Sequence, residues 1–344
     1  MKYRLLGNSG LRVSELSLGA MTFGEDWGWG SPQTEARKIY DAYRSAGGNF
    51  IDTANVYTNG SSEKFVGEFI RDHRQSVVLA TKYTNAGPGD DSNAAGNHRK
   101  SMVQALENSL RRLKTDYIDL YWLHIWDQMT PVEEVMRAFD DLVGQGKVLY
   151  IGVSDAPAWW IARANTLAEL RGWTQFVGLQ IEYSLTERTV ERELVPMAKA
   201  LKLGVVAWSP LAGGLLSGKY HSGGTVEGRY SNEMIKSFRP TGERADRIVA
   251  AVQEVAAEVG RSPAQVALAW LRSREVAVIP IIGARRIAQL EDNLASLDLT
   301  LTSEQVSTLD NASAIEKGFP YSMYEKELAR TLAYGGMRDK ILAA

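Results

Sequence analysis

The fold of this chain is decided by the stretch at residues 117–154, YIDLYWLHIWDQMTPVEEVMRAFDDLVGQGKVLYIGVS, where two short apolar runs flank an amphipathic one. Tyr117–His124 and Leu149–Ser154 are almost continuously apolar and rich in Ile, Leu, Val and Tyr. Such runs are typical of parallel strands that are buried on both faces. Between them, Thr130–Val143 spaces its apolar residues three and four positions apart, which predicts a helix with one buried stripe. The stretch is therefore a predicted strand–helix–strand unit.

The start of the helix in this unit carries a recognisable signal. Thr130 is suited to cap the helix, Pro131 suits its first position, and Glu133 completes a capping box. The same signal is repeated before the apolar run at residues 266–270, by Ser262, Pro263 and Gln265.

The alternation of apolar and amphipathic runs extends over the whole chain of 344 residues. The short apolar runs are Leu16–Met21, Asn49–Ala54, Val77–Tyr83, Tyr117–His124, Leu149–Ser154, Phe176–Tyr183, Gly204–Leu211 and Ala277–Ala284. Eight strands that alternate with helices, with no linker-like tract between two halves, predict an α/β fold closed into a (β/α)8 TIM barrel. We expect one domain over residues 1–344 rather than two ordinary domains, and the rival arrangement is a doubly wound open sheet.

Additions to the barrel are expected at both ends of the chain and on one face. The runs Tyr3–Leu6 and Leu11–Val13 predict a hairpin, so residues 1–13 would close the lower mouth of the barrel. Residues 314–344 are a C-terminal extension that either reaches over the site or packs outside the barrel. Loops longer than ordinary connections would lie on the C-terminal face, where barrel enzymes keep their active sites. They are Thr84–Asn97 and His221–Thr241.

The composition excludes several classes of protein. The chain is 44% apolar and 23% charged, and it contains no cysteine, so a disulfide scaffold, a thiolate nucleophile and a cysteine-ligated metal are excluded. Its 39 basic and 41 acidic residues give no overall positive field for nucleic acid. The N-terminal stretch lacks the apolar core of a signal peptide, and no apolar run approaches ~18 residues. We expect a cytoplasmic protein with no metal, nucleic-acid or membrane partner, either monomeric or homo-oligomeric.

Four ionisable side chains of four types lie at the same end of three consecutive predicted strands. Asp52 and Lys82 end the second and third strands, His124 ends the fourth, and Tyr57 lies in the loop after the second. The carboxyl ends of neighbouring parallel strands meet at one rim of a barrel, so these side chains are expected to converge. Each alone could be a cap, an ion-pair partner or a packing residue, but their location at one rim favours a catalytic site.

Together these four residue types suit the protonation of a carbonyl oxygen. An unperturbed Tyr has a pKa of about 10, and a nearby Lys ammonium favours the phenolate and lowers that pKa. An Asp beyond the Lys keeps it charged, and a neutral His can donate a hydrogen bond to the carbonyl oxygen. No side chain can supply a hydride, so a cofactor must supply it.

Eight stretches in the same order resemble the aldo-keto reductase family, including its bacterial members and its potassium-channel β-subunit branch, over essentially the whole chain. They are SLGAMTFG, FIDTANVY, LATKY, TDYIDLYWLH, IGVS, LQIEYS, WSPLAGGLLSGKY and IGARRIAQLEDNL. The resemblance implies a (β/α)8 barrel and an NADP-dependent oxidoreductase that reduces aldehydes, with ketones as further candidates, by hydride transfer. It implies Tyr57 as the general acid, tuned by Lys82 and Asp52, and His124 as the residue that orients the carbonyl group.

The resemblance also implies where NADPH binds. No G-x-G-x-x-G sequence opens a helix after a strand, so a Rossmann site is not supported. The glycine-rich segment after the seventh strand is either a plain flexible loop or a phosphate site of the kind common in barrels. The implied cofactor-binding residues are Ala20, Met21, Asp52, Ser154, Asp155, Gln180, Trp208, Ser209, Pro210, Leu211, Ala212, Gly213, Lys219, Arg229, Gly283, Arg285, Gln289, Asp292 and Asn293.

These residues have distinct implied roles. The resemblance implies that Trp208 stacks on the nicotinamide and that the three residues from the fifth and sixth strands hold its carboxamide. Ala20 and Met21 contact the cofactor through the backbone. The resemblance implies that Ser209–Gly213 and Lys219 line the pyrophosphate and that Arg229 approaches it. The residues implied around the adenosine 2′-phosphate are Gly283, Arg285, Gln289, Asp292 and Asn293.

Two positions depart from the commoner family pattern. Asp155 stands where Asn is frequent, and a carboxylate cannot donate to the carboxamide oxygen, which leaves more of the holding to Ser154. Gln289 stands where many members place an Arg on the 2′-phosphate, so Arg285 and Arg286 would supply the positive charge instead. The alternative is that this arginine pair is a solvated helix start. We expect NADPH, with NADH as the less favoured cofactor.

The expected substrate pocket is aromatic. Trp27 and Trp29 follow the first strand in a loop with little core of its own, and they either wall a substrate cavity or pack within that loop. The full set of expected pocket residues is Trp27, Trp29, Tyr57, Tyr83, His124 and Trp126.

Two other functions remain open. The first is an NADP(H)-binding regulatory or redox-sensing subunit with little turnover, such as the potassium-channel β subunits that the resembled family includes. Those subunits replace the His of the fourth strand with Asn, so His124 favours an enzyme. The second is an aldolase that forms a Schiff base through Lys82, but the cofactor segments would then have no role.

Overall fold

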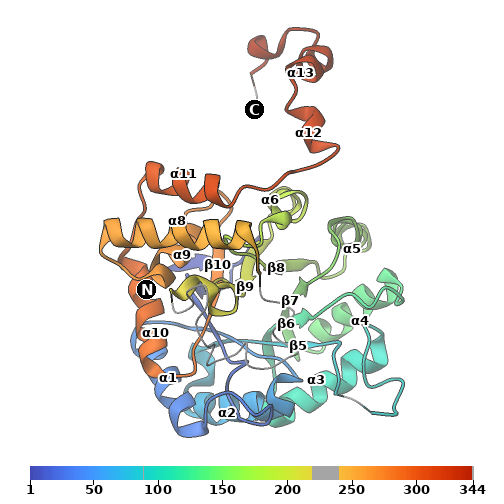
Figure 1. Ribbon diagram of the computed structural model, residues 1–344. Coiled ribbons are helices and arrows are strands. Elements are labelled where there is room, and N and C mark those ends of the chain that lie inside the picture. The colour runs from blue at the N-terminus through green and yellow to red at the C-terminus, as the bar shows by residue number, and fades with distance from the viewer. Residues whose placement is uncertain (88, 219–239, 343–344) are drawn as a thin grey trace.

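The eight short apolar runs contain the strands of a closed parallel barrel (Figure 1). The computed structural model describes residues 1–87, 89–218 and 240–342. Around the barrel the strands follow the order β10-β3-β4-β5-β6-β7-β8-β9, and every neighbouring pair is parallel. Their bounds are β3 Ser17–Gly19, β4 Phe50–Asp52, β5 Val78–Tyr83, β6 Ile118–Leu123, β7 Val148–Ser154, β8 Phe176–Glu182, β9 Gly204–Trp208 and β10 Val278–Gly283. The predicted (β/α)8 barrel is confirmed, and the open sheet is excluded.

Helices surround the barrel on its outer side (Figure 1). The main helices are α1 Gln33–Ser45, α2 Ser61–Ile70, α3 Arg99–Leu113, α4 Val132–Gly144, α5 Ala158–Arg171, α6 Leu194–Ala200, α8 Glu243–Val259, α9 Pro263–Arg272, α10 Ile287–Leu294 and α11 Ser303–Ala312. Short 3₁₀ helices join them, namely η1 Tyr57–Gly60, η2 Arg71–Ser76, η3 Thr189–Glu191, η4 Ala212–Ser217 and η6 Ala295–Asp298.

The two predicted helix starts have different outcomes. Ser262 caps α9 as predicted, because its hydroxyl accepts the N–H of Gln265 at 3.2 Å. Thr130 does not cap α4, which begins at Val132 with no side-chain cap. The Thr130 hydroxyl instead donates a charge-assisted hydrogen bond to the Asp127 carboxylate at 2.6 Å. The predicted capping box of α4 is therefore wrong.

Alternate residues of each strand face the interior of the barrel. The interior cluster includes two residues of the N-terminal hairpin, and its members are Leu6, Val13, Phe50, Val78, Ala80, Leu120, Trp122, Val206, Ile279 and Ile281. The intervening residues, such as Leu79 and Tyr121, belong to the larger core under the helices. The hairpin itself is formed by β1 Tyr3–Leu5 and β2 Arg12–Ser14, at the predicted place. Its Leu6 and Val13 are fully buried against the barrel residues, which closes this mouth.

Two glycines make room for the largest side chain inside the barrel. A Cβ on Gly152 would lie 2.3 Å from the Trp122 ring, and one on Gly178 would lie 2.8 Å from it. The fully buried Trp122, which pairs in register with Lys82, thus fills the interior of the barrel beside β7 and β8.

The described part of the C-terminal extension projects away from the body of the molecule rather than packing against it. It contains α12 Tyr321–Tyr324, α13 Glu327–Tyr334 and η7 Arg338–Lys340, and Figure 1 shows it leaving the body of the molecule beyond α11. The side chains of Phe319, Leu328 and Leu332 are exposed there. In the described parts of the chain, no helix has the length and apolarity needed to cross a membrane.

Candidate active site

Three of the four candidate catalytic residues come from the ends of consecutive strands. Asp52 is the last residue of β4, Lys82 lies near the end of β5, and His124 directly follows β6. Lys82 lies two residues after Ala80 of the interior cluster, so the alternation of the strand turns its side chain inward. Tyr57 begins η1, in the loop after β4. The structure therefore brings the predicted residues together at the C-terminal rim.

Lys82 is the centre of the polar contacts at this rim. Its ammonium is fully buried and forms an ion pair with the Asp52 carboxylate. The same Nζ donates to the Thr53 carbonyl at 3.0 Å and to the Tyr57 hydroxyl at 3.1 Å. Asp52 also accepts from the amide of Gln180 at 2.9 Å. A buried cation held in this way has a fixed position against the phenol oxygen.

His124 faces the ring of Tyr57. The two ring centroids lie 5.8 Å apart with an interplanar angle of 81°, an edge-to-face arrangement. Burial, together with the nearby Lys82 charge, holds the pKa of His124 well below its ordinary value, so the imidazole is neutral near pH 7. Its Nδ1 is buried and has no hydrogen-bond partner among the described residues. A neutral ring with a free polar atom is suited to bind a carbonyl oxygen.

The pKa of Tyr57 differs from the expectation in its net direction. Burial raises the pKa of the phenol above its ordinary value, whereas the Lys82 ammonium lowers it. For Lys82, burial lowers the pKa, but the Asp52 carboxylate and the Tyr57 hydroxyl raise it above its ordinary value overall. The predicted effect of the lysine on the tyrosine is thus present, but it opposes a larger effect of burial.

The residues expected to hold a nicotinamide line one side of the rim. The Ser154 hydroxyl is buried and makes no hydrogen bond of standard geometry in the described part of the chain, but it is near enough to the Asp155 carboxyl to lower the pKa of that group. The Trp208 indole N–H donates to the Asp155 carboxylate at 3.1 Å. A buried hydroxyl without a partner costs free energy unless a ligand satisfies it. Ser154, Asp155, Gln180 and Trp208 therefore fit a carboxamide and a flat ring placed beside Lys82.

The segment after β9 is a tight turn whose N–H groups are bonded within the segment. Ser209 accepts the N–H of Gly213 at 3.1 Å, and Gly213 and Gly214 both have left-handed backbones with φ of 64° and 105°. The Ala212 N–H donates to the Ser209 carbonyl at 2.8 Å and the Gly214 N–H to the Leu211 carbonyl at 2.9 Å, so these groups already have acceptors. Pro210, Leu211 and Ala212 complete this segment, whereas the expected contacts Lys219 and Arg229 lie outside the described residues.

The residues expected around a 2′-phosphate lie at the end of β10 and on α10. Gly283 is exposed and a Cβ there would meet no atom, and the Arg285 N–H donates to the Gln289 side chain at 2.8 Å. Asp292 accepts from Gln265 at 2.7 Å, and Asn293 is buried. On the side nearer β4, the Ala20 N–H donates to the Asp52 carbonyl at 2.8 Å, and Met21 follows it. Gly283 and Arg285 thus lie at the end of β10 and just before α10, whereas Asp292 and Asn293 lie in the last turn of that helix.

The tryptophans of the first loop lie beside Tyr57. The Trp27 and Tyr57 ring centroids are 6.4 Å apart, and those of Trp27 and Trp29 are 5.7 Å apart. The Trp27 indole donates to Asn59, two residues after Tyr57, at 3.3 Å. On the other side of the site, Trp126 packs edge-on against Trp159 at 5.6 Å. Trp27 therefore lies beside the phenol ring of Tyr57 and also packs against Trp29 of its own loop.

Tyr83 does not belong to this pocket. It is fully buried in the layer under the helices, where its ring packs 5.4 Å from Tyr121 and 5.7 Å from Phe139. Its hydroxyl donates to the Asn97 carbonyl at 3.2 Å. Lys82 points into the barrel, so the next residue of the strand must point outward. The expectation that Tyr83 lines the substrate cavity is corrected on this ground.

A comparison with known protein families identifies the family of this chain. The description of the matching model is aldo/keto reductase family, and it covers residues 15–314. The chain belongs to the aldo/keto reductase family. This membership makes it an oxidoreductase. In the parts of this aldo/keto reductase that the structure describes, no group of three or more His, Cys, Asp or Glu is placed to hold a metal.

Three relatives cover nearly the full length of this aldo/keto reductase. An aryl-alcohol dehydrogenase (NADP+) from Phanerodontia chrysosporium is 37% identical over 338 residues, which span 93% of this chain and 88% of the relative. A putative aryl-alcohol dehydrogenase, AAD14, from Saccharomyces cerevisiae is 38% identical over 339 residues, 94% and 89% of the two chains. A norsolorinic acid reductase from Aspergillus flavus is 38% identical over 331 residues, 92% and 82% of the two chains.

Sequence reasoning missed the turn that positions Tyr57 in this aldo/keto reductase. Thr58, Asn59 and Gly60 all have left-handed backbones, with φ of 46°, 52° and 91°. The buried Thr58 hydroxyl donates to the Phe23 carbonyl at 2.7 Å, which fixes the turn to the loop after β3. The Asn59–Gly60 pair is a turn signal that indicates this conformation, but it does not indicate the contact with Phe23.

A carboxylate at the start of α10 was also missed. Glu35 of α1 accepts the N–H of Ile287 at 2.9 Å and thereby occupies the helix terminus. A phosphate at this end of the rim would meet that negative charge, so its binding would depend on Arg285 and Arg286. Glu35 is separated from Ile287 by most of the chain, and no local pattern indicates the contact.

Proposed function

We propose that this aldo/keto reductase reduces aromatic aldehydes to alcohols with NADPH, and that Tyr57 is the general acid. The observation that carries the proposal is the Lys82 ammonium, which contacts the Tyr57 hydroxyl and is ion-paired with Asp52. A phenol beside a fixed buried cation is stabilised as a phenolate, so it can give up its proton. The names of the relatives, an NADP+ aryl-alcohol dehydrogenase among them, support the cofactor and the substrate class.

In the proposed mechanism, His124 and Tyr57 act on the carbonyl oxygen, and Lys82 and Asp52 act through Tyr57. The bound NADPH supplies the hydride for the carbonyl carbon. The neutral His124 donates a hydrogen bond that orients the carbonyl oxygen. Tyr57 gives that oxygen its proton as negative charge develops, and the Lys82 ammonium stabilises the phenolate that remains. Asp52 keeps the lysine charged and in place.

An assay of NADPH oxidation tests the proposed activity. The purified chain with 4-nitrobenzaldehyde is expected to consume NADPH and to form the alcohol in equal amounts. If NADPH binds but neither aromatic, short-chain nor sugar aldehydes cause its oxidation, the proposal is wrong and the role is that of an NADP(H)-binding regulatory subunit.

The choice between NADPH and NADH is tested by Arg285→Ala. A charge-assisted hydrogen bond to a phosphate contributes about 1.5–3 kcal/mol, so the Kd for NADPH is expected to rise about 10- to 100-fold. The Kd for NADH, which has no 2′-phosphate, is expected to change less than about twofold. Fluorescence titration measures both, and Arg37→Ala, on the exposed face of α1, is the control. Equal effects on the two cofactors would remove the proposed phosphate contact.

The departure at Asp155 predicts a pH effect on cofactor binding. Although part of the side chain is exposed, desolvation raises the pKa of Asp155 to about 6, against the opposing effect of the Trp208 indole. Below that pH the protonated carboxyl can donate to the carboxamide oxygen, whereas above it the carboxylate cannot. The Kd for NADPH should therefore increase as the pH rises from 5 to 7, by roughly fivefold for one hydrogen bond.

Asp155→Asn is the matched variant for this effect. Its amide donates at every pH, so only the titration of the 2′-phosphate, which the parent shares, should remain in the profile. The difference between the two pH profiles isolates Asp155. Parallel profiles for the parent and the variant would show that Asp155 has no part in the pH dependence.

A further inference from the structure

A cavity of about 450 Å³ opens beside the catalytic residues, between the loops that follow β6, β7 and β8. Its described lining residues include Trp126, Asp155, Thr189, Val190, Leu194 and Trp208. Most of these side chains are apolar, and two are tryptophans. Pockets of this volume and lining are typical sites for small aromatic molecules.

The cavity adjoins the chemistry of the site at its inner edge. Trp126 lies two residues after His124, and Trp208 donates to Asp155 across that edge. The Asp155 carboxylate is close enough to act on the charge of Tyr57, whose pKa it raises. Asp155 and Trp208 have a proposed role with the cofactor, whereas the outer wall, with Val190 and Leu194, has none.

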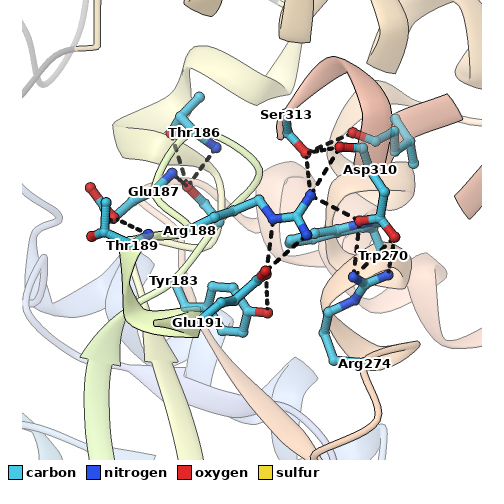
Figure 2. Close-up of polar contacts among 12 residues, drawn as sticks. Tyr183, Thr186, Glu187, Arg188, Thr189, Glu191, Trp270, Arg274, Asp310 and Ser313 are labelled. Carbon is cyan, nitrogen blue, oxygen red and sulfur yellow. Dashed lines mark hydrogen bonds and ion pairs between the residues drawn. The ribbon is translucent and has the colours of Figure 1, made fainter. Parts of the chain in front are cut away.

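The outer wall of the cavity includes η3, which has little stability of its own. It is a single 3₁₀ turn of three residues, Thr189–Glu191, and such short turns depend on tertiary contacts for their position. Its residues divide between two sides. Thr189 and Val190 line the cavity, whereas Glu191 contacts Arg188, the residue before the turn, whose side chain reaches α11 (Figure 2).

Arg188 holds this turn through all three of its side-chain nitrogens. Its Nε and Nη2 donate to the two oxygens of the Glu191 carboxylate at 2.8 and 2.9 Å. Its Nη1 donates to the Ser313 hydroxyl at 2.8 Å and lies 3.0 Å from the Asp310 carboxylate. Tyr183, at the end of β8, donates to Glu191 at 2.7 Å (Figure 2). The guanidinium is buried, so these contacts are shielded from water.

Asp310, which contacts Arg188, is itself held by further hydrogen bonds. Asp310 of α11 accepts from the Trp270 indole at 3.0 Å and from Arg274 at 2.9 Å. Both residues lie on or directly after α9, in the helical layer of the barrel. Arg188 therefore ties the cavity wall to α11 and, through Asp310, to α9, and Lys could not reproduce its two-pronged contact with Glu191.

We propose that this cavity is the subsite for the ring system of an extended aromatic carbonyl substrate, and that Arg188 is the positioning residue that fixes its η3 wall. The inference rests on the proposed function, because it assigns the substrate side of the same site. A substrate with a second fused ring would place that ring against Val190 and Leu194, whereas a short aldehyde would not reach them.

Filling the cavity tests the subsite. Val190→Trp places a large ring in the space, and the ratio of kcat/KM for 2-naphthaldehyde to that for butanal is expected to fall at least tenfold. The loss should appear in KM for the naphthyl substrate. A ratio equal to that of the parent would overturn the subsite, because a ligand in the cavity could not tolerate the added side chain.

Arg188→Lys tests the positioning role with a variant that keeps the charge. The same ratio of kcat/KM is expected to fall about fivefold or more, through KM, since the single ammonium loses the paired contact with Glu191. Arg192→Ala, in the same loop, removes a half-buried arginine that donates to the Glu316 carbonyl and does not line the cavity, and it should leave the ratio unchanged. A parental ratio in Arg188→Lys would overturn the positioning role. Glu191→Gln, which keeps the shape of the partner, must lower the ratio as well.

A binding measurement separates this inference from the proposed activity. Calorimetric titration with 2-naphthylmethanol, the product alcohol, needs no turnover and is expected to show at least tenfold weaker binding to Val190→Trp than to the parent. This difference would support the subsite even if no carbonyl were reduced. Turnover of aldehydes with equal naphthyl binding to both proteins would overturn the subsite and leave the proposed activity standing.

Discussion

Tyr57→Phe is expected to lower kcat for 4-nitrobenzaldehyde by at least about 100-fold, the lower range for the loss of a general acid. The variant keeps the ring and its edge-to-face contacts with Trp27 and His124, and it loses only the hydroxyl that contacts Lys82. The Kd for NADPH is expected to change less than about twofold, because the phenol is not among the proposed cofactor contacts. Steady-state kinetics and fluorescence titration measure the two quantities.

Tyr83→Phe is the matched control for this experiment. It removes a tyrosine hydroxyl one residue after Lys82, but that hydroxyl donates to Asn97 in the layer outside the barrel. Its kcat is expected to stay within about twofold of the parent value. If Tyr57→Phe reduced the aldehyde at a tenth of the parent rate or faster, another group would be the proton donor.

The contrast between Tyr57 and Tyr83 shows which part of the site could be predicted from the sequence. The alternation of a strand places residues of one parity inside the barrel, so an inward Lys82 excludes an inward Tyr83. Applied to β5, this rule places Lys82 inside the barrel and Tyr83 outside it, as in the structure. The convergence of Asp52, Lys82 and His124 follows from the same geometry, because all three lie at the carboxyl ends of parallel neighbours.

Contacts between distant segments could not be predicted in this way. Arg188 meets Ser313 and Asp310 across more than a hundred residues, and Thr58 meets Phe23 of another loop. Which acceptor each donor finds depends on how the loops pack, and no periodic pattern carries that information. Likewise, Thr130 has the residue type of a cap, but the nearby Asp127 carboxylate takes its hydroxyl. The local sequence indicates which side chains could form a given hydrogen bond, and tertiary packing determines which hydrogen bond forms.

Lys82→Met is expected to lower the free energy of unfolding by about 3–5 kcal/mol, the usual cost when one partner of a buried ion pair is removed. The variant leaves the Asp52 carboxylate buried with the amide of Gln180 as its remaining described side-chain partner. Denaturant unfolding, followed by circular dichroism, measures the change. An unfolding free energy equal to that of the parent would show that the ion pair does not stabilise the fold.

The double variant Asp52→Asn/Lys82→Met separates the structural role of this pair from its chemical one. Removing both charges leaves no unpaired ion in the barrel, so most of the lost stability should return. Turnover should not return, because the phenol of Tyr57 then has no cation to stabilise its conjugate base. A double variant that regains both stability and turnover would show that Lys82 only maintains the fold. A stable protein that still binds NADPH but does not reduce aldehydes would show that the ammonium acts on the proton of Tyr57.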